Sequence, residues 1–390
     1  MGQFFEYLEL SMFLRFMSME KNMVNVLMSS TTPMIKDGIT QVMLNLYQNV
    51  NYEKVHIDFV TINEPSNDII LKMIDRGSSY YYIPREIKHP ARFIKKYAQI
   101  CKNYDIVHVH GNSATMVLEL FAATLAGVKV RIAHSHNTYC IVKNIDKLCR
   151  PLFYHLCNVR LACGREAGEW LFKNRKFDIL NNGIITSKYK FDSTSRCKIR
   201  KELGWEDCFV LGHIGNFLAA KNHVFLINYF KVVSQNESLR LVLLGDGDLF
   251  ENIKSMVEEI GLRDKVFFAG SVDNVSDYLS AMDIFVMPST NEGFPLTLIE
   301  AQANGLKCMV SDCITKSVNL TGNVQFIPLT DMNFWVHALQ ENFSLCNRKK
   351  TSDSAIRKIV NKGYDISISA KKLEQIYFES YQNLGGALQQ

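Results

Sequence analysis

Apolar and polar positions follow two recurring patterns along this chain. Short runs rich in β-branched and aromatic residues are typical of buried strands, and stretches with apolar residues three or four positions apart are typical of helices. In the first half, strands are predicted at residues 24–28, 55–60, 80–83, 106–109 and 129–133. Helices are predicted between them at 39–49, 67–76, 92–103 and 113–126.

The same alternation starts again in the second half. Strands are predicted at 209–214, 239–244, 265–269, 284–287, 307–310 and 324–326, and helices at 223–235, 249–260, 276–281 and 296–303. Strand–helix alternation predicts a parallel sheet with helices on both faces. Two such series predict an α/β protein of two doubly wound, Rossmann-like domains that face each other across a cleft. Ligands of such sheets bind beyond the carboxyl ends of the strands.

A polar stretch around residues 187–200 separates the two series. We therefore expect an N-terminal Rossmann-like domain at 23–190 and a C-terminal one at 191–368. A last helical segment, within 369–390, is expected to cross back to the first domain. Residues 1–22 are interpreted as an N-terminal extension with little structure of its own, and an interfacial amphipathic helix is the alternative.

Composition narrows the class of protein. The 390 residues are 47% hydrophobic and 21% charged, as in a globular protein with room for two domains. The formal net charge of +5 is too small to argue for nucleic acid, and it suits an anionic small ligand or an anionic membrane surface. The ten cysteines form no C-x-x-C pair and no Cys/His cluster at zinc spacing, which predicts reduced thiols in the cytoplasm. No apolar run reaches the ~18–20 residues of a membrane span.

The strongest chemical signal is the sequence Asn-Glu-Gly-Phe-Pro-Leu-Thr-Leu-Ile-Glu-Ala at 291–301, which follows the predicted strand 284–287. Gly293 permits close approach of the backbone, and Pro295 is suited to the first position of a helix, where its missing N–H costs nothing. The amides of such a helix start can bind a phosphate or a sugar hydroxyl. Glu292 precedes the helix and Glu300 lies more than a turn inside it, so we expect them to reach different parts of one ligand. Such units are also common in α/β proteins without this role.

The stretch from Glu292 to Ala301 resembles the E-x7-E motif of the retaining GT-B glycosyltransferases of family 4, the glycosyl transferases group 1. The resemblance implies a GT-B fold, with Glu292 beside the donor sugar and Glu300 holding the ribose. The residues implied to contact the sugar and diphosphate of the donor are Gly293, Phe294, Pro295, Leu296 and Thr297.

A second element, Gly-His-Ile-Gly-Asn-Phe-Leu-Ala-Ala-Lys-Asn-His at 212–223, follows the first predicted strand of the second domain. Its glycines permit close backbone approach, and Lys221 supplies a positive charge near a helix start, as a diphosphate leaving group requires. The element resembles the family 4 segment that carries a glycine, an arginine and a lysine. Gly215 and Lys221 match it, whereas Asn216 occupies the position of the arginine. This departure implies either weaker donor affinity or a larger share of the phosphate contact for Lys221.

Two other glycine-containing loops give weaker signals. Leu-Gly-Asp-Gly-Asp at 244–248 contains a D-x-D triplet, which holds a divalent metal in another glycosyltransferase fold. Its position matches the G-x-G turn of the GT-B family instead, and no metal is expected. Near the N-terminus, Gly38 in Asp-Gly-Ile-Thr resembles the family loop that approaches the donor phosphates, although an Asp-Gly pair is also a common turn.

Histidines cluster at the ends of two predicted strands of the first domain. His108 and His110 form one pair and His134 and His136 the other, and alternate residues of a strand share a face. Two such pairs are compatible with a metal site, but no carboxylate accompanies them at ligand spacing. By resemblance, His136 contacts the donor sugar near the reacting carbon, with His134 as the alternative. His110 is expected on the acceptor side, and His108 is equally compatible with a buried position.

Basic residues gather between positions 85 and 102, where Glu86 alone opposes them. They are Arg85, Lys88, Arg92, Lys95, Lys96 and Lys102. This pattern is compatible with a helix that rests on an anionic membrane and brings the protein to a lipid-linked acceptor. A solvated helix face accounts for the same pattern.

The resemblance covers about residues 24–381 and implies a retaining enzyme of capsule, exopolysaccharide or O-antigen assembly. Such an enzyme moves a sugar from a nucleotide-diphosphate sugar, with UDP the default, to a growing lipid-linked glycan, and it needs no metal or other cofactor. His136, Glu292 and Lys221 are the expected catalytic residues. The alternatives are a nucleotide-sugar 2-epimerase and a non-catalytic donor-binding subunit of a transferase pair, which Asn216 favours. The expected location is cytoplasmic, at the inner face of the membrane.

Overall fold

The computed structural model describes residues 23–85, 89–140, 142–343 and 347–385, and the chain divides into two compact units. The first unit comprises the chain up to Ser135, Cys140–Leu180 and the residues from Ala370 onward. The second comprises Asn181–Ser369 together with the short segment His136–Tyr139. The extension predicted at 1–22 lies outside the described residues.

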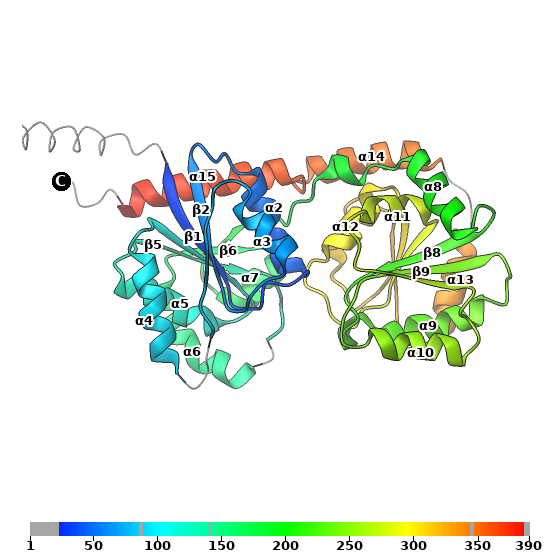
Figure 1. Ribbon diagram of the computed structural model, residues 1–390, viewed down its shortest axis with the longest axis horizontal. Coiled ribbons are helices and arrows are strands. Elements are labelled where there is room, and N and C mark those ends of the chain that lie inside the picture. The colour runs from blue at the N-terminus through cyan, green and yellow to red at the C-terminus, as the bar shows by residue number, and fades with distance from the viewer. Residues whose placement is uncertain (1–22, 86–88, 141, 344–346, 386–390) are drawn as a thin grey trace, which may run out of the picture. The chain divides into compact units, whose positions relative to one another are not determined.

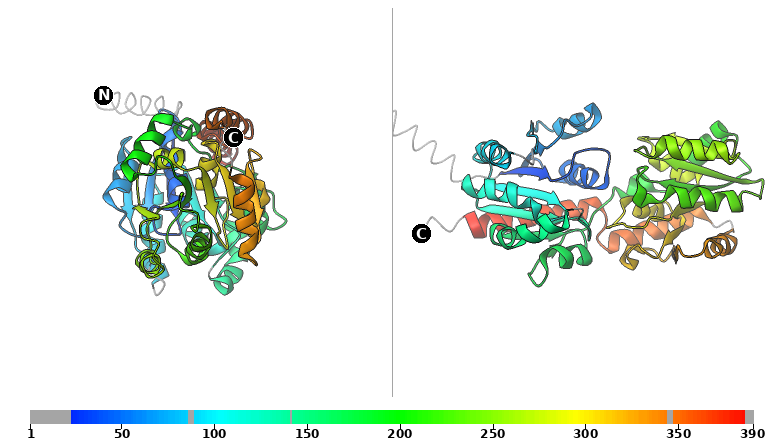
Figure 2. Two further views of the ribbon diagram at one scale, coloured as in Figure 1. Left: turned by 90° about the vertical axis from the view of Figure 1, so that its right-hand side faces the viewer. Right: turned by 90° about the horizontal axis from the view of Figure 1, so that it is seen from below.

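The first unit is built on a seven-stranded sheet in the order β3-β2-β1-β4-β5-β6-β7, and helices cover both of its faces (Figure 2). Its strands are β1 (Val24–Ser30), β2 (Val55–Thr61), β3 (Tyr80–Tyr82), β4 (Ile106–Gly111), β5 (Val130–Ser135), β6 (Val159–Ala162) and β7 (Asp178–Ile179). Its helices are α2 (Gly38–Asn49), α3 (Asn67–Ile74), α4 (Pro90–Cys101), η1 (Ala114–Met116), α5 (Val117–Leu125), α6 (Lys143–Leu156) and α7 (Arg165–Phe172). All the strand pairs of this sheet are parallel.

The second unit is built on a six-stranded parallel sheet in the order β10-β9-β8-β11-β12-β13 (Figure 1). Its strands are β8 (Phe209–Ile214), β9 (Leu239–Leu244), β10 (Val266–Gly270), β11 (Ile284–Met287), β12 (Lys307–Ser311) and β13 (Val324–Ile327). Its helices are η2 (Thr186–Tyr189), α8 (Ser193–Leu203), η3 (Ala219–Lys221), α9 (His223–Val233), α10 (Phe250–Glu259), α11 (Val275–Ala281), α12 (Leu296–Ala303), η4 (Lys316–Val318), α13 (Met332–Asn342) and α14 (Arg348–Asn361). Two doubly wound α/β domains are thus confirmed.

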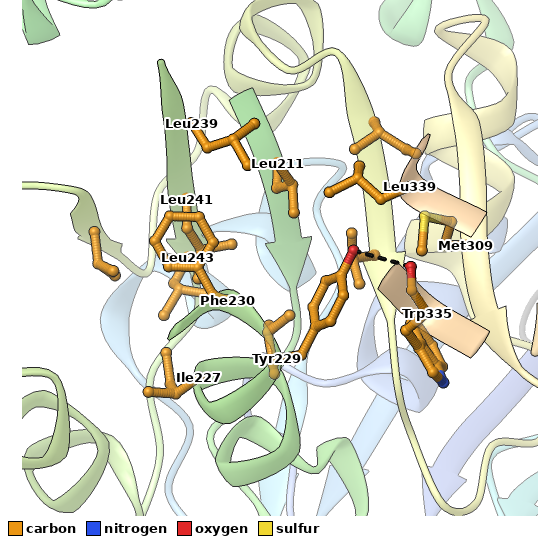
Figure 3. Packing of buried hydrophobic residues seen from close by; sticks show 14 of the residues in the cluster. Leu211, Ile227, Tyr229, Phe230, Leu239, Leu241, Leu243, Met309, Trp335 and Leu339 are labelled. Atoms are coloured by element: carbon orange, nitrogen blue, oxygen red, sulfur yellow. Dashed lines mark hydrogen bonds between the residues drawn. The ribbon is translucent and has the colours of Figure 1, made fainter. Parts of the chain in front are cut away.

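An apolar core holds α9, α10 and α13 of the second unit against its sheet. Leu211 of β8 and Leu241 of β9 lie in it, and Tyr229 of α9 and Trp335 of α13 pack beside them (Figure 3). These side chains are almost completely buried, and the Tyr229 hydroxyl donates a hydrogen bond to the Trp335 carbonyl at 3.3 Å. Burial of this apolar surface is the main source of stability of the domain, because it removes the surface from water.

The long last helix, α15 (Ile366–Gly385), begins in the second unit and belongs to the first from Ala370 onward. Its Leu373 and Tyr377 are fully buried against the first unit. Glu374 accepts a hydrogen bond from the backbone N–H of Asn51 at 2.7 Å. The helix is therefore an integral part of the first unit's packing.

The segment 181–190, predicted to end the first domain, groups with the second unit. Ile184 forms a parallel bridge with Asp365, and the Thr186 hydroxyl donates to the Asp365 carboxylate at 2.6 Å. The Ser369 hydroxyl donates to the Asn181 carbonyl at 2.9 Å. These contacts join positions far apart in sequence, so the polar composition around 187–200 does not reveal them. Among the described residues, no helix is both long and apolar enough to cross a bilayer.

Candidate functional site

Two loops of the second unit lie side by side at the carboxyl ends of neighbouring strands. β8 pairs with β11, so the loops that leave these strands are adjacent. The backbone N–H of Thr290 donates to the Ala220 carbonyl at 2.8 Å, and the Asn222 amide donates to the Pro288 carbonyl at 3.1 Å. These bonds hold the predicted lysine loop against the predicted glutamate loop.

Lys221 and Glu292 form an ion pair across these two loops. The Lys221 ammonium lies 2.6 Å from a Glu292 carboxylate oxygen, and the side chains are only 19% and 12% exposed. A charge-assisted hydrogen bond in such a partly buried place is stronger than one at the surface. The sequence predicted separate tasks for the two residues, whereas the structure shows that they contact each other directly.

Glycines bring two backbone segments together next to this ion pair. A side chain at Gly215 would meet the Lys221 side chain and the His213 ring at 3.2 Å. Gly245 and Gly247 have φ angles of +132° and +149°, and a side chain at Gly245 would collide with the Gly215 carbonyl oxygen at 2.1 Å. The G-x-G turn at 245–247 therefore packs against the lysine loop through its backbone, as close packing without side chains requires.

Gly293 is the point of closest approach between the glutamate loop and the segment His136–Tyr139, both of which belong to the second unit. A side chain at Gly293 would lie 2.6 Å from the His136 carbonyl oxygen, a distance that real Cβ atoms do not tolerate. The backbone that Gly293 was predicted to approach is therefore, in this structure, that of the predicted catalytic histidine.

His136 is 6% exposed, and burial lowers the pKa of its imidazole to about 3. The ring is consequently neutral at physiological pH, with one nitrogen that donates and one that accepts hydrogen bonds. A neutral imidazole can contact sugar hydroxyls without placing a second full positive charge near Lys221.

The helix after the glutamate loop spans the predicted residues 296–303, but the expected role of Pro295 differs. α12 begins at Leu296, and Pro295 is the residue that precedes it rather than its first helical residue, with an extended backbone (φ −69°, ψ 116°). The Phe294 ring stacks on Tyr364 at 5.1 Å, so this side chain packs against the protein and can serve a ligand through its backbone only. Leu296 is buried as well, and Thr297 is half-buried.

Glu300 lies on α12 and is 6% exposed. Burial raises the pKa of its carboxyl to about 7, and a hydrogen bond with the Tyr189 hydroxyl lowers that pKa in part. A hydrogen-bond donor such as a ribose hydroxyl would stabilise the ionised form of this buried carboxyl group. Sequence reasoning missed Tyr189, which lies in η2 far from the motif and belongs to no recognisable pattern.

Asn216 and Gly38 complete the predicted set. Asn216 is half-buried in the lysine loop, and its carbonyl accepts a hydrogen bond from the N–H of Leu218 at 2.7 Å. Gly38 belongs to the first unit, where it opens α2. A side chain there would meet nothing within 4 Å, and the carboxylate of Asp37 caps the helix by accepting from the Thr40 N–H at 2.9 Å.

Three histidines of the first unit form a buried cluster. His108, His110 and His134 are all 0% exposed, and the His108 and His110 rings stack at 4.2 Å. His108 Nδ1 lies 2.7 Å from the Tyr377 hydroxyl, and its Nε2 lies 3.3 Å from His134 Nδ1. Potential ligand atoms of the three residues lie within 4.8 Å of one another, so among the described residues this is the group that could hold a metal ion. His134 faces this cluster, which favours His136 over it as the sugar contact.

Sequence comparison places these features in a known context. The sequence model of the family "Glycosyl transferases group 1" matches residues 195–320, which include both loops and α12. The chain is 30% identical to the glycosyltransferase EpsF of Bacillus subtilis over 319 residues, which cover 77% of this chain and 82% of EpsF. It is 28% identical to a "UDP-Gal:alpha-D-GlcNAc-diphosphoundecaprenol alpha-1,3-galactosyltransferase" of Escherichia coli, with coverages of 76% and 81%.

Solved structures share the fold. HepE of Anabaena, crystallised in complex with UDP, superposes with a TM-score of 0.75 at 14% identity, covering 92% of this chain and all of HepE. WaaG, a glycosyltransferase of lipopolysaccharide biosynthesis, has a TM-score of 0.65 at 14% identity, covering 90% of this chain and 99% of WaaG. The GT-B fold expected from the sequence is thereby confirmed.

Proposed function

Because the chain belongs to the glycosyl transferases group 1 family, we propose that it moves a sugar from a UDP-sugar to a growing, lipid-linked surface polysaccharide with retention of configuration. The observation that carries the proposal is the position of Lys221 and Glu292, which meet at 2.6 Å where two strand ends and the start of α12 converge. This is the edge at which sheets of this kind bind their ligands.

The chemistry follows from the charges at this edge. Departure of the sugar leaves negative charge on the diphosphate, which Lys221 and the free amides at the start of α12 can stabilise. Glu292 lies beside Lys221 and is placed to accept hydrogen bonds from sugar hydroxyls. The neutral imidazole of His136 contacts the sugar from the segment that approaches Gly293. These groups supply positive charge without a metal ion, so transfer is proposed to be metal-independent.

Retention without a covalent intermediate is the reaction course that these residues support best. A front-face displacement needs the leaving group to stay close while the acceptor attacks from the same side. Lys221 would hold the departing diphosphate, and Glu292 would keep the oxocarbenium-like sugar in place. The Glu300 carboxylate would fix the ribose, and therefore the orientation of the whole nucleotide.

Two comparisons support the donor and acceptor classes. HepE, which shares the fold, was crystallised with UDP, and the E. coli relative carries UDP-Gal and diphosphoundecaprenol in its name. We propose that an acceptor of that kind receives its sugar at the cytoplasmic face of the membrane. The free cysteines of the described residues fit this reducing compartment.

Nucleotide binding and transfer are tested separately. Thermal unfolding is measured with UDP and with other nucleoside diphosphates, with and without a chelator. A ligand at ~100 times its dissociation constant adds about 2.7 kcal/mol of stability. We expect a shift with UDP that the chelator does not change. A UDP shift that the chelator abolishes would refute metal independence, and the absence of any nucleotide shift would favour the non-catalytic subunit instead.

Transfer is then followed as release of UDP from a UDP-sugar in the presence of membrane extract that supplies the acceptor. Glu292→Ala should abolish transfer while the UDP shift persists, since Glu292 is proposed to contact the sugar. Glu258→Ala, an exposed glutamate on α10, serves as the control and should behave as the wild type. Normal turnover by Glu292→Ala would refute the assigned role.

A further inference from the structure

Helix α6 presents an apolar stripe to solvent. Val142, Ile145, Leu148 and Leu152, called here the α6 stripe, are 42%, 51%, 81% and 48% exposed. The last three are spaced by three and four positions, so they share one side of the helix. A row of exposed apolar side chains on a helix is typical of a surface that binds a membrane or another protein.

The opposite side of α6 fixes the helix firmly to the first unit. Asp146 is 5% exposed and accepts a hydrogen bond from the Ala114 N–H at 2.8 Å. It also pairs with Arg150 at 2.7 Å, and Arg150 donates in turn to the Leu171 carbonyl at 3.0 Å. Phe153 is fully buried on the same side. The outward direction of the α6 stripe is therefore set by specific polar contacts on the inner side.

Exposed basic residues lie on α6 and on the nearby helix α4. α4, α5 and α6 are neighbours in the first unit (Figure 1). The exposed basic residues on α4 and α6 are Arg92, Lys95, Lys96, Lys143 and Lys147. Across these three helices, all of whose residues the structure describes, the two carboxylates are Glu119 and Asp146, and both are buried and paired with arginines. The exposed charged residues of these three helices are consequently all basic.

We infer that α6 is an interfacial helix that docks the first unit on an anionic lipid bilayer. The α6 stripe enters the boundary between headgroups and acyl chains, and Lys143 and Lys147 meet the lipid phosphates beside it. The basic residues of α4 add a longer-range attraction to the same surface. Apolar side chains on one face with lysines at its border are the composition of helices that lie in the plane of a membrane.

This inference extends the proposed function, since a lipid-linked acceptor resides in the bilayer. It names α6 rather than the basic α4 segment as the part that inserts, because α4 buries its large apolar side chains Phe93 and Tyr97 inside the protein. The experiment that tests membrane docking by α6 needs neither an acceptor nor catalytic turnover.

The test is co-sedimentation of the full chain with vesicles. Phosphatidylcholine vesicles with and without about a third phosphatidylglycerol distinguish apolar from electrostatic contributions. We expect binding that requires the anionic lipid. The double change Ile145→Glu with Leu148→Glu should weaken binding roughly tenfold or more, since it places charge in the inserted face. Lys143→Glu with Lys147→Glu should weaken mainly the dependence on phosphatidylglycerol.

A matched control comes from α3 of the same unit, where Leu71 and Ile74 are 64% and 40% exposed. The double change Leu71→Glu with Ile74→Glu alters the same residue types by the same charge and should leave vesicle binding within about twofold. Melting temperatures and the UDP shift are measured for every variant. A retained UDP shift shows that the α6 variants are folded, and it separates a failure of this inference from a failure of the proposed function.

An insertion readout complements the binding assay. Leu148→Trp should show fluorescence quenching by brominated lipids, and Leu71→Trp should show none. Equal vesicle binding by the α6 and α3 double variants would overturn the inference, as would the absence of quenching at position 148.

Sedimentation velocity tests whether the α6 stripe is instead a dimer interface. If the wild type is a dimer that the α6 change dissociates while vesicle binding persists, the α6 stripe is an interface between copies of the chain.

Discussion

The Lys221 ammonium lies 2.6 Å from the Glu292 carboxylate, and this contact links two residues whose predicted tasks were separate. In the absence of a ligand, each charge neutralises the other in a partly buried place. A bound UDP-sugar would bring a diphosphate to the lysine and hydroxyls to the glutamate. The ion pair between them therefore keeps both side chains in position before a ligand binds.

Lys221→Met should reduce transfer by about two orders of magnitude and weaken UDP binding roughly tenfold. The change removes the cation proposed to stabilise the departing diphosphate. Initial rates and UDP affinity by calorimetry provide the measurement. Lys231→Met, at an exposed lysine of α9, is the control. Transfer by Lys221→Met within about twofold of the control would show that the lysine serves only the ion pair.

Gly293→Ala should impair folding of the glutamate loop and depress transfer strongly. The added carbon would lie 2.6 Å from the His136 carbonyl oxygen, so one of the two backbones must move. Gly38→Ala meets nothing within 4 Å and should leave the melting temperature unchanged or slightly higher, because alanine favours a helix. Transfer rates and melting curves of both variants are compared. If Gly293→Ala has wild-type activity, the close approach is not required for catalysis.

Glu300→Gln should flatten the pH dependence of stability. Burial raises the pKa of Glu300 from 4.5 to about 7, so the native state binds this proton more tightly than the unfolded state. The stabilisation of the native state by this bound proton is complete below pH 4.5 and is lost as pH rises through about 7. The change in the free energy of unfolding across this window is on the order of 3 kcal/mol, and the neutral glutamine removes it.

Urea titrations at several pH values measure this effect in the nucleotide-free protein. Glu258→Gln, on the exposed side of α10, should keep the wild-type profile. A Glu300→Gln profile with the same slope as the wild type between those pH values would mean that another group governs the titration.

Tyr377→Phe should lower the free energy of unfolding by about 1–3 kcal/mol. The change removes the hydroxyl that lies 2.7 Å from His108 Nδ1, and both residues are completely buried. Tyr82→Phe alters a tyrosine that is 47% exposed on β3 and should have almost no effect. Denaturant unfolding compares the two variants. An equal loss in both would show that the contact between α15 and β4 contributes little.

The sequence alone determined the type and order of most elements and the residues of the two site loops. Strand β11 and the glutamates around α12 were predicted as found, because periodicity and turn residues act locally. α6 was not predicted from the sequence, and the pattern alone does not reveal which of its sides faces solvent. Ile145, Leu148 and Leu152 are exposed, while Asp146, Arg150 and the buried Phe153 hold its inner side.

Only the tertiary structure decided which distant residues meet. Lys221 and Glu292 are 71 positions apart, and His108 and Tyr377 are 269 apart. The identity of the group that Gly293 approaches, and the placement of segment 181–190 in the second unit, were settled in the same way. Local preferences fix where a strand ends and a loop begins. Which loops then lie together depends on strand order in the sheet, and strand order is a property of the whole folded chain.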